Sequence, residues 1–121
     1  MKKIFVVDDD EFLLDMYALK FREKNFDIKI SSKGDEALEK IRAGLRPDVM
    51  LLDIVMPAID GFEILAAVKK EKLLPDTIII ALTNLGQKED IQKAMNLGAD
   101  DYIIKAHFTP SEVVERVEKL L

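Results

Sequence analysis

Short apolar runs of strand length alternate five times with stretches of helical period, and this alternation is the feature that most constrains the fold. The sequence predicts strands over residues 4–7, 28–31, 49–52, 78–82 and 102–104. It predicts helices over residues 11–24, 35–43, 62–72, 88–97 and 110–121. Strands that alternate with helices in this way are typical of an α/β fold, in which a parallel sheet is flanked by helices.

The polarity of the strands indicates their order in the sheet. Residues 4–7, 49–52 and 78–82 are apolar throughout, as expected for strands buried on both faces. Residues 28–31 alternate between apolar and polar side chains, which suits an edge strand. A second strand at the edge, with right-handed crossovers, predicts a doubly wound, flavodoxin-like sheet of order 2-1-3-4-5 with five flanking helices.

Length and composition exclude several classes of protein. The 121 residues suit one domain spanning residues 1–121, and we expect no output domain beside it. Lys and Arg total 18 against 23 Asp and Glu, so the formal charge is −5 and direct binding of nucleic acid is not expected. There is no Cys, which excludes disulfides and thiolate chemistry. No segment approaches the ~20 apolar residues of a membrane span, so we expect a soluble, cytoplasmic protein.

Acidic residues follow two strands that this strand order places side by side. Asp8, Asp9 and Asp10 follow the first strand, and Asp53 follows the third. The carboxyl ends of these strands frame the ligand crevice in a sheet of this order. Asp10 suits the N-cap of the next helix, whereas no helix is expected after Asp53 until about Asp60. The sequence therefore predicts a cluster of carboxylates with a role other than helix capping.

Such a cluster needs compensating charge. Two carboxylates about 5 Å apart repel by roughly 3 kcal/mol at an effective dielectric near 20, so they must take up a proton or bind a cation. An all-oxygen site favours Mg²⁺ or Mn²⁺. Thr83 and Lys105 end the fourth and fifth strands and add a hydroxyl and an ammonium to the same rim. This combination suits transfer of a phosphoryl group to a carboxylate, for which Asp53 is the best candidate nucleophile.

Five motifs occur in the order and spacing of one known family. They are VVDD at 6–9, LLDIVMP at 51–57 with DG at 60–61, ALT at 81–83, GADDY at 98–102, and Lys105. On these motifs the chain from residue 3 to residue 121 resembles the receiver domain of two-component response regulators, of the stand-alone, chemotaxis-regulator type. The resemblance implies a phosphorylation-dependent signalling switch, not an enzyme beyond its own phosphorylation and dephosphorylation.

The resemblance also implies roles for individual residues. Asp53 would accept a phosphoryl group from a sensor histidine kinase. Asp9 would bind the metal ion directly and Asp8 largely through water, and the backbone carbonyl of Val55 would complete the protein ligands beside Asp53. Lys105 would pair with the phosphoryl group.

The resemblance also implies a conformational change that carries the signal from the site to the surface. Thr83 would swing inward to the phosphoryl group, and Tyr102 would turn from exposed to buried. This change would alter the face built by the fourth helix, fifth strand and fifth helix, and with it the binding of a downstream protein that the sequence does not identify. A monomer and a phosphorylation-dependent dimer both remain open.

The chain departs from the family pattern at two places, and two further positions near the acceptor and the switch Thr are apolar. Ala106 follows Lys105 where the family usually has Pro in a cis peptide, and a cis bond without Pro costs about 2.5 to 4 kcal/mol, which leaves a trans loop open. Asn84 is bulkier than the residue often found after the switch Thr, and we expect it to restrict access by phosphate donors. Val55 and Leu85 are apolar and cannot orient an attacking water, so we expect the acyl phosphate to last longer than in relatives with polar groups at these positions.

Two other classes of protein share parts of this pattern. A phosphohydrolase with an aspartyl nucleophile generally carries a second Asp two residues on, where this chain has Val55. A flavodoxin-like FMN carrier would need a hydroxyl- and Gly-rich phosphate loop after the first strand, where this chain presents Asp8, Asp9 and Asp10. Both alternatives are disfavoured on these residues.

Overall fold

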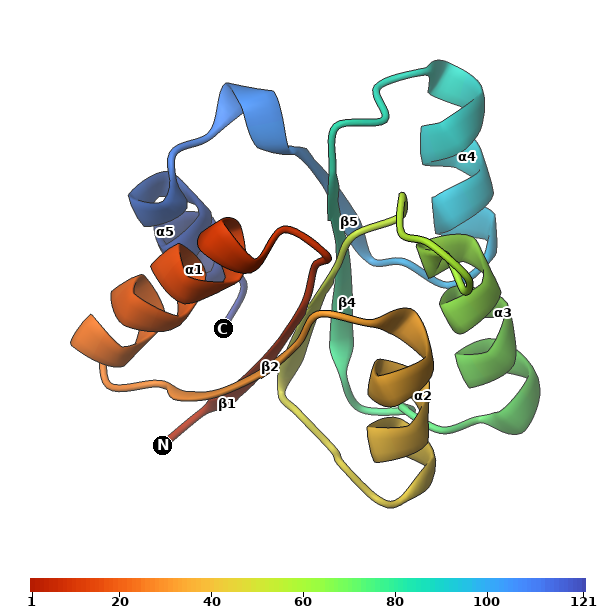
Figure 1. Cartoon of the computed structure of the whole chain (residues 1–121), viewed down its shortest axis with the longest axis horizontal. Helices are drawn as coiled ribbons and strands as arrows, with labels where there is room; N and C mark the ends of the chain where they lie inside the picture. Colours follow the sequence, from red (N-terminus) through yellow and green to blue (C-terminus); the bar gives the residue numbers. More distant parts are fainter.

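Five parallel strands form one sheet in the order β2-β1-β3-β4-β5 in a computed structural model that describes all residues, 1–121 (Figure 1). The strands are β1 (Lys3–Val7), β2 (Asp27–Ser31), β3 (Val49–Leu52), β4 (Ile78–Thr83) and β5 (Asp101–Ile104). The helices are α1 (Glu11–Glu23), α2 (Gly34–Arg42), α3 (Gly61–Glu71), α4 (Lys88–Asn96) and α5 (Pro110–Leu120). The predicted fold class and strand order are confirmed, and each predicted boundary lies within one residue of the observed one.

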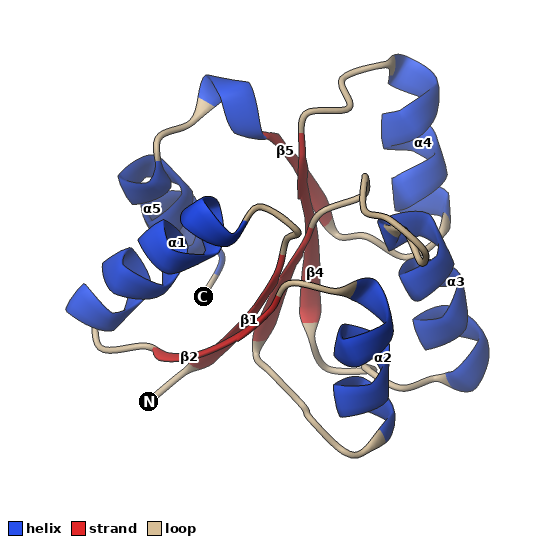
Figure 2. Cartoon of the chain, viewed as in Figure 1, coloured by secondary structure: helices blue, strands red, loops and turns tan.

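Helices cover both faces of the sheet (Figure 2). Helices α1 and α5 pack on one face, and α2, α3 and α4 pack on the other. Successive side chains of a strand point to opposite faces, so β1 sends Phe5 and Val7 into one apolar cluster and Ile4 and Val6 into the other. The central strands are therefore apolar on both faces, as their sequences predicted. None of the helices combines the length and the apolar character that a bilayer crossing requires.

Local sequence signals explain where the helices begin and end. The Asp10 side chain accepts the Leu13 N–H at 3.1 Å and caps α1, as predicted. Thr109 and Glu112 form the predicted capping box at the start of α5. Gly44 and Gly98, just beyond α2 and α4, have φ values of 116° and 107°, which favour Gly over other residues. The structure adds a short 3₁₀ helix, η1 (Lys105–His107), which was not predicted.

The segment between β3 and α3 folds back tightly against the end of β3. The Gly61 N–H donates to the Ile54 carbonyl at 2.8 Å. A Cβ at Gly61 would lie 2.4 Å from the Asp53 carbonyl oxygen and 2.7 Å from Ile54 Cα, so only Gly permits this approach. On the other side, a Cβ at Gly34 would lie 2.3 Å from the Ile59 carbonyl oxygen. Two close backbone contacts therefore fix the segment that follows Asp53.

Candidate functional site

Three carboxylates meet at the carboxyl ends of β1 and β3, and one oxygen from each of Asp8, Asp9 and Asp53 lies within 4.8 Å of the others. The two strands are paired in parallel up to Val7 and Leu52, so the residues that follow them emerge side by side. Asp8 and Asp53 are only 1% and 5% exposed, whereas Asp9 is exposed. The acidic cluster that the sequence placed at this edge is therefore present.

The ammonium of Lys105 reaches this cluster from the end of β5. Its Nζ lies 2.9 Å from Asp53 Oδ2 and 2.6 Å from Asp8 Oδ2. The Lys105 side chain is only 10% exposed. The ammonium neutralises one of the three negative charges of Asp8, Asp9 and Asp53. An excess of negative charge therefore remains in a site where two of the three carboxylates are buried.

Burial and pairing act in opposite directions on the charged groups of the site. Burial raises the pKa of the Asp8 carboxyl to about 6, against the lowering effects of Lys105 and of the Asp10 N–H. Burial lowers the pKa of the Lys105 ammonium, but its contacts with Asp8 and Asp53 outweigh this effect and the pKa is raised. Both shifts favour the protonated form, so the site favours binding of a proton or of another cation.

The donor atoms fit a hard divalent cation. Asp8 Oδ2 is buried, and although it lies 2.6 Å from Lys105 Nζ, no donor meets it with hydrogen-bond geometry. The neighbouring ligands are carboxylate oxygens, and no His or Cys belongs to the group. Oxygen donors of this kind suit Mg²⁺ and ions like it. The residues Asp8, Asp9 and Asp53 could therefore hold such an ion.

Thr83 and Tyr102 lie on the side of the site formed by β4 and β5. Thr83 is fully buried, and its Oγ1 is 3.5 Å from the Leu85 N–H. The Tyr102 hydroxyl donates to the Leu85 carbonyl at 2.7 Å, and the ring is half buried. Burial raises the pKa of Tyr102 to about 12. The expected movement of Thr83 and Tyr102 involves a second state and stays a prediction.

The sequence did not reveal a contact between the loops next to Thr83 and Lys105. The Ala106 N–H donates to Asn84 Oδ1 at 3.0 Å. The signal available in the sequence was the absence of Pro after Lys105, which leaves an N–H free to donate. All peptide bonds are trans, including the one between Lys105 and Ala106.

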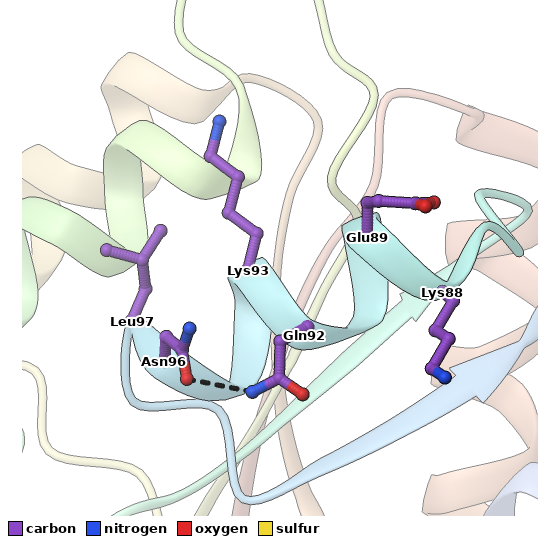
Figure 3. Close-up of a pocket in the computed structure, with 6 residues that line it drawn as sticks. All are labelled: Lys88, Glu89, Gln92, Lys93, Asn96 and Leu97. Carbon is purple, nitrogen blue, oxygen red and sulfur yellow. Dashed lines mark hydrogen bonds between the residues drawn. The ribbon is translucent and has the colours of Figure 1, made fainter.

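A depression of about 590 Å³ on the surface lies along α4, away from the carboxylates. Figure 3 shows the side chains that line it in two rows along the helix, with Gln92 and Asn96 in one row and Lys93 in the other. The Gln92 side chain donates a hydrogen bond to Asn96 Oδ1 at 2.9 Å. Ala94 is the only buried residue of α4. This depression contains none of the acidic cluster, which lies at the edge of the sheet.

The fold and this site together define a receiver domain. Residues 4–118 match the response regulator receiver domain family, and the chain belongs to that family. Receiver domains are generally signalling modules rather than enzymes. The resemblance seen in the sequence is thereby confirmed, and the disfavoured phosphohydrolase and FMN-carrier interpretations are set aside.

The chain is similar to curated bacterial regulatory proteins. The chain is 36% identical over 120 residues to the alkaline phosphatase synthesis transcriptional regulatory protein PhoP of Bacillus subtilis, covering 99% of this chain and 48% of that protein. It is 35% identical over 121 residues to the response regulator SaeR of Staphylococcus aureus, covering 100% of this chain and 51% of that protein. The chain thus spans about half the length of the curated relatives it matches.

Solved structures agree with the family assignment. The receiver domain of the Francisella response regulator 1452 superposes with a TM-score of 0.87 at 31% identity, covering 99% of this chain and 96% of that one. The chemotaxis response regulator CheY4 of Vibrio cholerae gives a TM-score of 0.89 at 28% identity, covering 100% of this chain and 99% of that one.

Proposed function

We propose that this domain is a phosphorylation-dependent signalling switch whose acceptor is the Asp53 carboxylate. One observation carries the proposal: Asp53, Asp8 and Asp9 share one site, and Lys105 contacts both buried carboxylates. Membership of the receiver domain family supports it. The phosphoryl donor that we propose is the phosphohistidine of a sensor histidine kinase, since the relatives are response regulators.

The transfer is a nucleophilic substitution at phosphorus. An Asp53 carboxylate oxygen forms a bond to phosphorus while the bond from phosphorus to the donor nitrogen breaks, and the donor imidazole leaves with that electron pair and takes up a proton. The product is an acyl phosphate on Asp53. Lys105 Nζ lies 2.9 Å from Asp53 Oδ2, where it can balance negative charge that builds up on the phosphoryl oxygens.

Asp8, Asp9 and Asp53 would hold a divalent ion, which we propose to be Mg²⁺, together with the backbone carbonyl of Val55. Val55 lies directly beside the acceptor, because its N–H donates to Asp53 Oδ1 at 3.3 Å. A bound divalent cation supplies positive charge that neutralises phosphoryl oxygens and lowers the repulsion felt by an anionic donor. Asp8 Oδ1 also accepts a hydrogen bond from the Asp10 N–H at 2.9 Å, and this bond orients the Asp8 carboxylate.

The signal would pass to the surface through β4 and β5. A phosphoryl group adds about −1.5 to −2 charges and three strong acceptor oxygens, which attract the Thr83 hydroxyl. The Thr83 hydroxyl and the Tyr102 hydroxyl both contact Leu85, so movement of Thr83 acts on the element that Tyr102 holds. We propose that a downstream protein reads this change on the face of α4, β5 and α5. Phosphorylation then shifts an existing equilibrium between two conformations.

Mass spectrometry after incubation with acetyl phosphate and Mg²⁺ tests the acceptor. We expect the wild type to gain the mass of one phosphoryl group and Asp53→Asn to gain none. Asp10→Asn is the matched control, because Asp10 is an exposed helix cap beside the site, and it should be modified like the wild type. An unmodified wild type, or equal modification of Asp53→Asn, would overturn the proposal.

A further inference from the structure

One hydrogen bond joins the two loops that carry Thr83 and Lys105. The Ala106 N–H donates to Asn84 Oδ1 at 3.0 Å across 22 positions of sequence. Asn84 directly follows Thr83, and Ala106 directly follows Lys105. The bond therefore connects the residues immediately next to two groups of the proposed site.

The position of this bond explains why a side chain is needed there. Strands β4 and β5 are paired in parallel as far as Thr83 and Ile104, and the register ends at that pair. Ala106 lies in the first turn of the 3₁₀ helix η1, where backbone N–H groups have no partner within the helix. The Asn84 carboxamide accepts this N–H and continues the connection between the two loops beyond the last pair of the sheet.

The position of the Lys105 side chain depends on the position of the loop that follows β5. Its Nζ contacts Asp53 and Asp8 at 2.9 Å and 2.6 Å, yet its backbone lies where β5 gives way to η1. Asn84 and Ala106 are both exposed, so the bond between them adds little to the burial of the core. The bond instead restrains the backbone at Ala106, which is the residue next to Lys105.

We propose that Asn84 is a positioning residue for Lys105: by holding the Ala106 N–H, it fixes the loop that presents the Lys105 ammonium to Asp53. This inference rests on the proposed function, since it concerns how fast Asp53 is phosphorylated. It differs from the expectation that Asn84 acts by its bulk to restrict access of donors. The two ideas predict opposite effects of removing the side chain.

Three substitutions at Asn84 separate hydrogen bonding from bulk. Asn84→Leu keeps the size and removes the acceptor, Asn84→Ala removes both, and Asn84→Asp keeps an acceptor oxygen. We expect Asn84→Leu and Asn84→Ala to lower the maximal rate of phosphorylation by acetyl phosphate about three- to tenfold, the ratio that one ordinary hydrogen bond provides. Asn84→Asp should recover most of that rate. Asn96→Leu is the matched control on exposed α4 and should leave the rate unchanged.

Amide hydrogen exchange at Ala106, measured by NMR without any phosphate donor, reports the bond directly. We expect faster exchange at Ala106 in Asn84→Leu and Asn84→Ala, and protection in Asn84→Asp and the wild type. Unchanged exchange in all variants would overturn the inference, as would changed exchange with an unchanged rate, or a rate that rises in Asn84→Ala. A wild type that is never phosphorylated would instead overturn the proposed function and leave the exchange result standing.

Discussion

Replacing Asp8 by Asn should stabilise the metal-free domain at neutral pH, although Asp8 belongs to the proposed metal site. Asp8 is 1% exposed, and its Oδ2 lacks a hydrogen-bond donor of good geometry. An Asn side chain has nearly the same shape and keeps one carbonyl oxygen, which can still accept the Asp10 N–H. The substitution therefore removes a buried charge and preserves the local hydrogen bond.

The size of the effect follows from the pKa of Asp8. Burial raises it from 3.8 to about 6, so the folded state binds more protons than the unfolded state between these values. The stability that Asp8 provides is therefore present at low pH and lost as the pH rises through about 6. At pH 7 the ionised group costs about 3 kcal/mol. We expect a gain of about 2 kcal/mol in Asp8→Asn, because Lys105 loses one of its partners.

Urea unfolding followed by circular dichroism measures this difference in the presence of a chelator. The gain of Asp8→Asn over the wild type should be about 2 kcal/mol at pH 7 and should nearly vanish at pH 4. Addition of Mg²⁺ should narrow the gap at pH 7, because an ion that binds only the folded state stabilises the wild type. Asp10→Asn, which exchanges one good helix cap for another, is the control and should show neither effect.

Two results would refute the reasoning about Asp8. One is a loss of stability in Asp8→Asn at pH 7, which would mean that the ion pair with Lys105 outweighs the cost of burying the carboxylate. The other is a gain of equal size at pH 4 and pH 7, which would mean that the effect comes from packing and not from charge.

Three further predictions concern the same region. Val55→Asn places a polar group beside the acceptor that can orient water, so the acyl phosphate should decay faster than in the wild type, as followed by mass spectrometry over time; equal decay would remove the idea. Gly61→Ala forces a Cβ to within 2.4 Å of the Asp53 carbonyl oxygen and should lower the free energy of unfolding by about 2 kcal/mol or more in urea, whereas an unchanged value would mean that the loop relaxes easily. Lys105→Met removes the ammonium and should slow phosphorylation by acetyl phosphate about 10²-fold, and a rate within twofold of the wild type would exclude a role in charge balance.

The sheet was predictable because its signal is local and repeated. Each central strand is an uninterrupted apolar run, and the alternation in residues 28–31 marked β2 as the edge. Asp8, Asp9 and Asp53 could be brought together because parallel strands deliver their next residues to a common edge. No knowledge of side-chain conformation was needed for that step.

Contacts between loops could not be predicted from the sequence pattern. The 3₁₀ helix at Lys105–His107 is too short to show a hydrophobic period. The bond from Ala106 to Asn84 depends on how the ends of β4 and β5 are set against each other, and a sequence pattern does not reveal that offset. The tight approach of Gly61 to Asp53 likewise depends on a backbone path between two elements.

Helix α4 is attached to the domain by little apolar surface, since Ala94 is its only buried residue. Segments with few buried contacts open at a lower free energy than the core, so amide exchange in α4 should be faster than in α1, which buries Leu14, Tyr17, Ala18 and Phe21. A protein that binds α4 could therefore displace the helix from its position on the domain at a small cost in free energy. Helix α4 begins at Lys88, five residues after Thr83, so a displacement of Thr83 would act on a helix that is held by little apolar contact.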